Sequence, residues 1–232
     1  MKFKGKNVLV TGAAGNLGKA VAAAFEREGA SLVLFDIDDK TLRAAYPAGG
    51  HLLVPVNLLD PASVGTAVET ALKKVGRIDV LANIAGGFRM GDPVHATPVD
   101  TWRLMIELNA GTVMNMARAV VPNMLANGGG KIVSIAATAG LGGKPDMGAY
   151  GASKAAVIRL TESMAGELRD KGINVNCVMP SIIDTPQNRA DMPSADPKKW
   201  VAPGALADVI MFLASDAARA VHGAAVPVVG LS

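Results

Sequence analysis

The sequence predicts a single α/β domain, residues 1–232, whose parallel sheet of about seven strands is doubly wound. Three observations carry this prediction. A length of 232 residues suits one such domain. Short β-branched runs alternate with longer amphipathic stretches along the chain. These short runs are apolar throughout, which indicates strands covered by helices on both faces.

Each element follows from this alternation. We expect strands at residues 7–11, 31–36, 52–56, 78–83, 130–136, 173–178 and 225–229. We expect helices at residues 16–28, 39–45, 61–74, 99–125, 149–170 and 203–214. The stretch from Pro180 to Pro203 breaks the pattern, and its Met192 and Trp200 are apolar residues in a polar segment. We therefore predict a substrate lid at 184–203, with a plain surface connection as the alternative.

Composition excludes several classes of function. Half of the residues are hydrophobic, the net charge is +3, and the basic residues form no long run, which argues against a nucleic-acid partner. No apolar stretch reaches the ~18 residues of a membrane span or the core of a signal peptide. The one cysteine, Cys177, suits a buried thiol in a cytoplasmic protein. His51, His95 and His222 lack metal-ligand spacing, so no metal is expected.

A glycine-rich turn follows the first expected strand. It runs from Thr11 to Gly18 and opens a helix, and its predicted cofactor-binding residues are Gly12, Gly15, Asn16, Leu17 and Gly18. Glycines let the backbone approach a pyrophosphate, and the helix N-terminus supplies N–H donors. The placement between strand and helix predicts the dinucleotide-binding, or Rossmann, arrangement.

Asp36 ends the second expected strand, 18 residues after Gly18. A carboxylate near this distance accepts hydrogen bonds from the adenosine ribose hydroxyls and repels a 2′-phosphate. Asp38 and Asp39 follow, with no Arg beside them. The sequence therefore favours NAD over NADP, although Asp36 could instead be a turn residue at a strand end.

Tyr150 and Lys154 are four residues apart, which places both on one face of a helix. A fixed ammonium beside a phenol stabilises the phenolate, so we expect Lys154 to lower the pKa of Tyr150 from about 10. A Tyr tuned in this way can pass a proton near neutral pH. Beside a dinucleotide site, the pair predicts hydride transfer coupled to proton transfer.

The whole chain now resembles the short-chain dehydrogenase/reductase family. Further landmarks of that family fall in order: Asn57 and Leu58, then Asn83, Ala85 and Gly86, then Asn109, and finally Pro180, Ile183 and Thr185. The resemblance implies that Asn57 and Leu58 contact adenine and that the last three contact the nicotinamide carboxamide. It implies that Asn83, Ala85, Gly86, Tyr150 and Lys154 contact the cofactor, with Lys154 holding the nicotinamide ribose. It also implies that Asn109 supports a proton-relay water, with a solvent-facing polar residue as the alternative. Asn83 is expected to stabilise a strand end.

Two positions depart from the family pattern. Ser181 follows Pro180 where the family has Gly. Ala137 stands thirteen residues before Tyr150, where the family usually has a Ser that polarises the substrate carbonyl. A missing oxyanion donor can cost about two decades in rate, so ordinary ketone reduction should be weak.

In this departure the chain resembles the dihydropteridine-reductase branch of the family, whose members also lack that Ser. The loop of that branch after the fourth strand is similar to Ala85-Gly86-Gly87-Phe88. Its lid is similar to the stretch from Asp184 to Arg189, then Met192-Pro193, and Ala195-Asp196 with Trp200. Ala137, Phe88, Met147, Met192 and Trp200 are our candidate substrate residues, with plain core packing as the alternative for the Met and aromatic residues. Thr11 stands where those reductases often carry Tyr.

The sequence hypothesis is an NAD(H)-dependent oxidoreductase acting on a C=O or conjugated C=N group, such as a quinonoid dihydropterin. One alternative is a broad carbonyl or hydroxyl dehydrogenase similar to a 3-oxoacyl reductase. Another is a non-catalytic dinucleotide-binding sensor. Small residues on the helix at 149–170 permit close helix packing, and family analogy implies a homodimer or homotetramer.

Overall fold

The computed structural model describes residues 1–232 and contains one parallel sheet of seven strands. The strands are β1 (Asn7–Thr11), β2 (Ser31–Asp36), β3 (Leu52–Pro55), β4 (Val80–Asn83), β5 (Gly130–Ile135), β6 (Ile173–Pro180) and β7 (Ala225–Val228). Their order across the sheet is β3-β2-β1-β4-β5-β6-β7. The chain therefore winds outwards in both directions from the boundary between β1 and β4, and the predicted doubly wound fold is confirmed.

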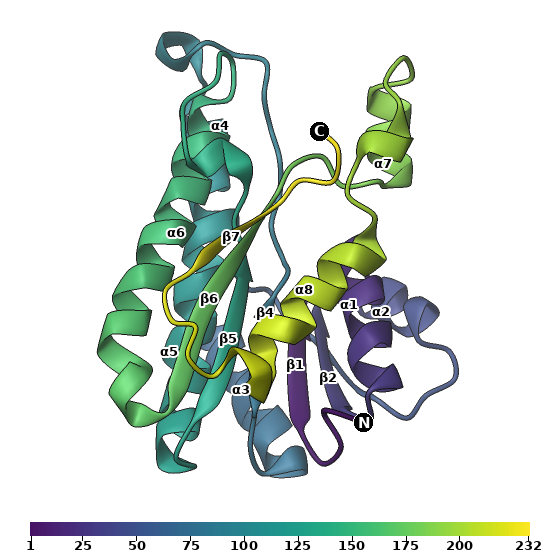
Figure 1. The fold of residues 1–232 in the computed structure, drawn as a ribbon, viewed down its shortest axis with the longest axis vertical. Coiled ribbons are helices and arrows are strands. Elements are labelled where there is room, and N and C mark those ends of the chain that lie inside the picture. Colours follow the sequence, from purple (N-terminus) through teal and green to yellow (C-terminus); the bar gives the residue numbers. More distant parts are fainter.

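Helices cover both faces of the sheet (Figure 1). One face carries α1 (Asn16–Arg27), α2 (Asp39–Ala45) and α8 (Pro203–Ala214), and the other carries α3 (Pro61–Val75), α5 (Thr112–Ala126) and α6 (Gly148–Leu168). None of these helices is long and apolar enough to cross a membrane.

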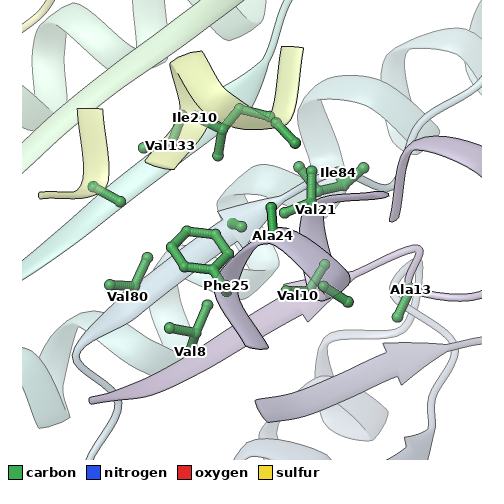
Figure 2. Close-up of a cluster of buried hydrophobic side chains, with 14 of the residues drawn as sticks. Val8, Val10, Ala13, Val21, Ala24, Phe25, Val80, Ile84, Val133 and Ile210 are labelled. Carbon is green, nitrogen blue, oxygen red and sulfur yellow. The ribbon is translucent and has the colours of Figure 1, made fainter. Parts of the chain in front are cut away.

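The core forms because successive strand residues point to opposite faces. Val8 and Val10 of β1 join the apolar cluster under α1 and α8, whereas Leu9 joins the cluster under α3 and α5. Figure 2 shows Phe25 of α1 lying over Val8 and Val80 in the first cluster. Phe25 is fully buried, and burial of such a side chain contributes about 1.5–3 kcal/mol.

The helix expected at 99–125 is interrupted. It consists of α4 (Val99–Ile106), a π-helical turn η2 (Glu107–Gly111) and α5. At this turn the Thr112 N–H donates to the carbonyl of Glu107, five residues earlier, and the Thr112 hydroxyl donates to the Leu108 carbonyl at 2.9 Å. The extra residue in the turn changes which side chains face the sheet, and the apolar periodicity does not reveal it.

The segment after β6 is less irregular than expected. It contains α7 (Pro186–Asp191), where the Thr185 hydroxyl accepts the Asn188 N–H at 3.1 Å. A Thr cap followed by Pro is a helix start signal, so this short helix could have been predicted from the sequence. The segment extends beyond the carboxyl ends of the strands (Figure 1). A bridge between Ile183 and Val201 joins the two ends of the segment, so the segment has a closed base. The role of the segment as a substrate lid stays a prediction.

Candidate active site

A cavity of about 580 Å³ opens at the carboxyl ends of β1 and β4, where the sheet order reverses. This is the position at which open α/β sheets bind ligands. The predicted cofactor residues that line it are Gly12, Gly15, Asn16, Leu17, Gly18, Asp36, Asn57, Leu58, Ala85, Gly86 and Thr185. The structure therefore brings together residues that span most of the sequence.

The glycine turn is shaped by close backbone approach. Gly12 has a φ of +63°, and a Cβ there would lie 2.9 Å from the Cα of Ala85. A Cβ at Gly18 would overlap the carbonyl oxygen of Gly12. Because both overlaps involve backbone atoms, a side chain at either position would displace the turn. The spaced glycines thus leave room and N–H donors for a pyrophosphate, and this cradle fits a dinucleotide.

Thr11 holds the turn against β4, a role that no sequence pattern predicted. Its buried hydroxyl accepts the N–H groups of Ile84 and Ala85, at 3.0 and 3.1 Å. These two residues begin the loop after β4, and both line the cavity. The sequence feature that could have indicated this role is the position of Thr11 directly before Gly12.

Asp36 lines the end of the cavity that is predicted to hold adenosine. Its Oδ2 accepts the Ala14 N–H at 2.8 Å and its Oδ1 accepts the Ile37 N–H at 2.8 Å. Each oxygen keeps a further lone pair, so the carboxylate can still accept ribose hydroxyls. The carboxylate therefore both holds the glycine turn and fits the predicted cofactor.

The part of the cavity predicted to hold adenine is lined by more residues than the sequence indicated. Asn57 and Leu58 line it, together with Ile37 and Thr41, which directly follow the Asp36 signal. The Leu58 carbonyl accepts from the Asn115 side chain of α5 at 2.9 Å. This contact crosses 57 residues of sequence and was not predictable from local pattern.

Lys154 and Tyr150 belong to α6 and lie outside the lining of the cavity, which reaches Gly86 at its inner end. The Lys154 ammonium is buried and donates to the Ile135 carbonyl at 2.9 Å. A Cβ at Gly86 would lie 3.3 Å from its Nζ, so the ammonium sits beside the cavity wall. The Nζ is 5.9 Å from the centre of the Tyr150 ring. The predicted pair thus shares one helix face without a direct hydrogen bond.

The expected lowering of the Tyr150 pKa is wrong for this arrangement. Burial raises the pKa of Tyr150 to about 12. Burial also lowers the pKa of Lys154 to about 8, because the ammonium loses its hydration. Helical spacing correctly placed the two residues together, but it gave no measure of burial, which is the main cause of both pKa shifts.

Asn109 turns inward at the π turn and fixes the loop after β4. Its Oδ1 accepts the Gly87 N–H at 3.0 Å, and its Nδ2 donates to the Gly87 carbonyl at 3.1 Å and to the Ser153 hydroxyl at 2.9 Å. The solvent-facing alternative is therefore wrong. Because both amide protons of Asn109 are used, a relay water could contact only its side-chain or backbone carbonyl oxygen. The proton-relay role of Asn109 stays a prediction.

The candidate substrate residues surround Tyr150 unevenly. The Phe88 ring meets the Tyr150 ring edge-on, with centroids 4.8 Å apart. Met147 lies directly before α6 and is half-buried. Met192 follows α7 and is also half-buried, whereas Trp200 is only 7% exposed and lies at the closed base of the segment. Phe88 and Met147 are therefore the better placed candidates.

Three other predicted residues support the cavity from behind its walls. Asn83 is buried at the end of β4 and donates to the Ser134 hydroxyl at 3.2 Å, as expected for a residue that stabilises a strand end. Pro180 ends β6 and is buried, and Ile183 follows in the bridge to Val201. The contact of Pro180 and Ile183 with nicotinamide stays a prediction.

The fold and the site together define a dinucleotide-binding oxidoreductase of the α/β class. The family model described as short chain dehydrogenase matches residues 6–195. The 3-oxoacyl-(acyl-carrier-protein) reductase of Thermotoga maritima is 35% identical to this chain, with 99% of this chain and 98% of the reductase covered. The chain belongs to the short-chain dehydrogenase family.

Two further proteins carry NAD in their names. The 2-dehydro-3-deoxy-L-rhamnonate dehydrogenase (NAD(+)) of a Sphingomonas species is 36% identical, with 80% of this chain and 75% of that enzyme covered. The crystal structure of NAD+-bound xylitol dehydrogenase superposes with a TM-score of 0.92 at 28% identity, with 99% of this chain and 100% of that chain covered. These similarities support NAD as the cofactor.

Gly18→Ala should weaken NADH binding by more than tenfold, because the added Cβ would overlap the Gly12 carbonyl oxygen and displace the turn. The matched control is Gly65→Ala in α3, where a Cβ meets nothing within 4 Å. NADH fluorescence titration measures both variants. Equal affinity in the two variants would contradict the proposed role of the turn.

Lys154→Met should stabilise the cofactor-free protein at pH 7. Between pH 8 and 10.5 the unfolded chain binds the Lys154 proton more tightly than the folded chain, so folded-state stability rises with pH across this window. Below pH 8 the fold carries the cost of a buried ammonium, and its removal should gain about 1–3 kcal/mol. Urea unfolding at pH 7, 8.5 and 10 measures the effect.

The stability gain of Lys154→Met should shrink as the pH approaches 10.5, because the folded wild-type protein no longer holds a buried charge there. Exposed Lys74 of α3 gives the control variant Lys74→Met, for which no such pH-dependent gain is expected. A gain that is constant with pH, or a loss at pH 7, would contradict the burial of a costly charge.

Proposed function

We propose that this protein transfers hydride between NAD(H) and a conjugated C=O or C=N group, with Tyr150 as the proton donor. Bound NADH would supply the hydride at the inner end of the cavity. The observation that carries the substrate class is Ala137, which follows the carboxyl end of β5 and brings no hydroxyl to the site. A conjugated substrate spreads the developing charge over its own atoms and has less need of a second donor.

We assign no neighbouring hydroxyl group to replace the hydroxyl that is missing at Ala137. The Ser134 hydroxyl is fully buried within the sheet and accepts from Asn83. Ala137 has extended backbone, with a φ of −163° and a ψ of 157°, and Thr138 begins a 3₁₀ helix directly after it. Tyr150 is therefore the one hydroxyl donor that we assign to the substrate.

The pKa of Tyr150 favours this direction of proton transfer. With burial raising that pKa to about 12, the phenol stays protonated at neutral pH and is ready to donate as hydride arrives. The nearby Lys154 ammonium would stabilise the phenolate that remains after the transfer. Reduction is thus the direction that the resting protonation state supports.

The rim of the site carries exposed apolar side chains among charged ones such as Arg89, Asp92 and Asp146. Phe88, Met90 and Val94 are 46%, 57% and 75% exposed on the loop after β4, and Leu141 is 62% exposed on the loop before α6. The Gly91 N–H donates to the Asp146 carbonyl at 2.9 Å and joins these two loops. Such a rim supports a flat substrate with apolar faces. A quinonoid dihydropterin is one such compound, as the sequence resemblance suggested.

A second candidate is a carbonyl or hydroxyl dehydrogenase of broader type. The names of the relatives favour it, because a 3-oxoacyl reductase acts on a ketone and a xylitol dehydrogenase on an alcohol. The matched test is NADH oxidation with quinonoid dihydropterin beside β-keto and cyclic ketones. Tight NADH binding with no turnover on any of these would favour the sensor alternative.

The remaining assignments concern cofactor choice and assembly. Asp36 in the adenosine wall supports NAD over NADP, since a carboxylate there repels a 2′-phosphate. Trp102 and Met114 are 47% and 50% exposed on α4 and α5, which supports a second copy of the chain as partner. A homodimer or homotetramer in the cytoplasm is the form that we propose.

Tyr150→Phe should lower kcat by at least about a hundredfold while NADH affinity changes little, because only the proton donor is removed. Steady-state turnover with the best substrate of the panel and NADH titration give the two quantities. Full turnover in Tyr150→Phe would overturn the assignment of the acid.

Ala137→Ser should raise kcat/KM for simple ketones by about tenfold or more, because the new hydroxyl can stabilise the oxyanion. Conjugated substrates should gain much less. Ala152→Ser makes the same chemical change at an exposed position of α6 and serves as the control. If both substrate classes gained equally, Ala137 would not set the substrate class.

A further inference from the structure

Tyr46 touches the phosphate-binding turn from outside the cavity. Its hydroxyl donates to the carbonyl of Ala13 at 2.7 Å, across 33 residues of sequence. Tyr46 directly follows α2 and is half-buried, whereas Ala13 is fully buried between Gly12 and the cavity-lining Ala14. Figure 2 shows Ala13 just past the β1 residue Val10. No motif in the sequence points to this contact.

The contact completes a set of three restraints on the same short turn. The Ala13 N–H donates to the Phe35 carbonyl at 3.0 Å, and the Ala14 N–H donates to Asp36 at 2.8 Å. Both of those partners belong to β2. Tyr46, the residue directly after α2, supplies the third restraint through the Ala13 carbonyl. The turn is therefore held by two elements that meet at the adenosine end of the cavity.

The Tyr46 ring is itself held in place. His51 meets it edge-on, with ring centroids 5.7 Å apart, and the His51 Nε2 lies 3.4 Å from a carboxylate oxygen of Glu26 on α1. Buried Leu42 anchors α2 to the core, and Thr41 of the same helix lines the cavity. A fixed ring means that the hydroxyl is already aimed at Ala13 before any cofactor arrives.

We propose that Tyr46 is a positioning residue for the adenosine half of the cofactor. It does not line the cavity; it acts by fixing the turn and α2 in the geometry that the adenosine diphosphate needs. This inference rests on the proposed NAD(H) function. A binding site preorganised in this way avoids part of the ordering cost of association, so its loss should appear as weaker binding rather than slower chemistry.

Tyr46→Phe tests the proposal because it removes the hydroxyl and keeps the ring. We expect the dissociation constants of NADH and of ADP-ribose to rise by a similar factor of about five, as loss of one hydrogen bond predicts. Binding of nicotinamide mononucleotide and kcat at saturating NADH should stay unchanged. Isothermal titration and steady-state kinetics give these four quantities.

Thr70→Val is the matched control. It removes a hydroxyl that donates to a backbone carbonyl, that of Thr66 at 2.8 Å, on the exposed side of α3. Small and similar losses of melting temperature are expected in both variants, but only Tyr46→Phe should lose affinity for ADP-ribose. This separates positioning from a general loss of stability.

Two results would overturn the inference while the proposed function survives. One is wild-type affinity for NADH and ADP-ribose in Tyr46→Phe, and the other is a lowered kcat at unchanged affinity. The wild-type titration in the same series tests the function itself. If the wild-type protein bound no NADH, the proposed function would fail, and the role of Tyr46 would fail with it.

Discussion

The carboxyl ends of β1 and β4 lie close enough to form one site because Gly12 has no side chain. Its backbone approaches Ala85 more closely than a Cβ would allow, and the Thr11 hydroxyl accepts the two N–H groups that begin the neighbouring loop. This junction is where the sheet order reverses, so the loops that line the cavity start from strands that it positions. The glycine turn, Asp36 and the loop from Ala85 to Phe88 all depend on it.

The same junction explains why the inner end of the cavity is electrostatically unusual. The loop after β4 is fixed on one side by Thr11 and on the other by Asn109, and Gly86 between them leaves room for the Lys154 ammonium. The ammonium is covered by α6 and the sheet, with the Ile135 carbonyl as its hydrogen-bond acceptor. A buried, partly satisfied cation lowers the stability of the empty protein, and a bound partner that offers it acceptors would recover that free energy.

The sequence predicted the parts of the molecule that depend on local pattern. Strand and helix positions follow from periodicity, and the glycine turn and Asp36 follow from spacing, because these features repeat in any doubly wound sheet. The π turn at Glu107–Gly111, the clamp of Asn109 on Gly87 and the contact of Tyr46 with Ala13 were not foreseen. Each joins distant segments or departs from helical period. The sign of the Tyr150 pKa shift failed for a related reason, since burial is a property of the whole fold.

In the proposed function, the absence of a hydroxyl at Ala137 leaves Tyr150 as the hydroxyl donor assigned to the substrate. A site with two hydroxyl donors can stabilise the charge that develops on a simple ketone oxygen. A site with one donor must rely on that donor and on the substrate's own delocalisation of the charge. With its pKa raised by burial, the Tyr150 phenol is protonated at neutral pH and can act only as a donor at the start of the reaction. The Phe88 ring lies perpendicular to the Tyr150 ring, so it restricts the approach to the proposed donor with an apolar side chain. Under the proposed function, selection in this site would rest on the shape of the substrate and on charge delocalisation within it, more than on a side-chain clamp.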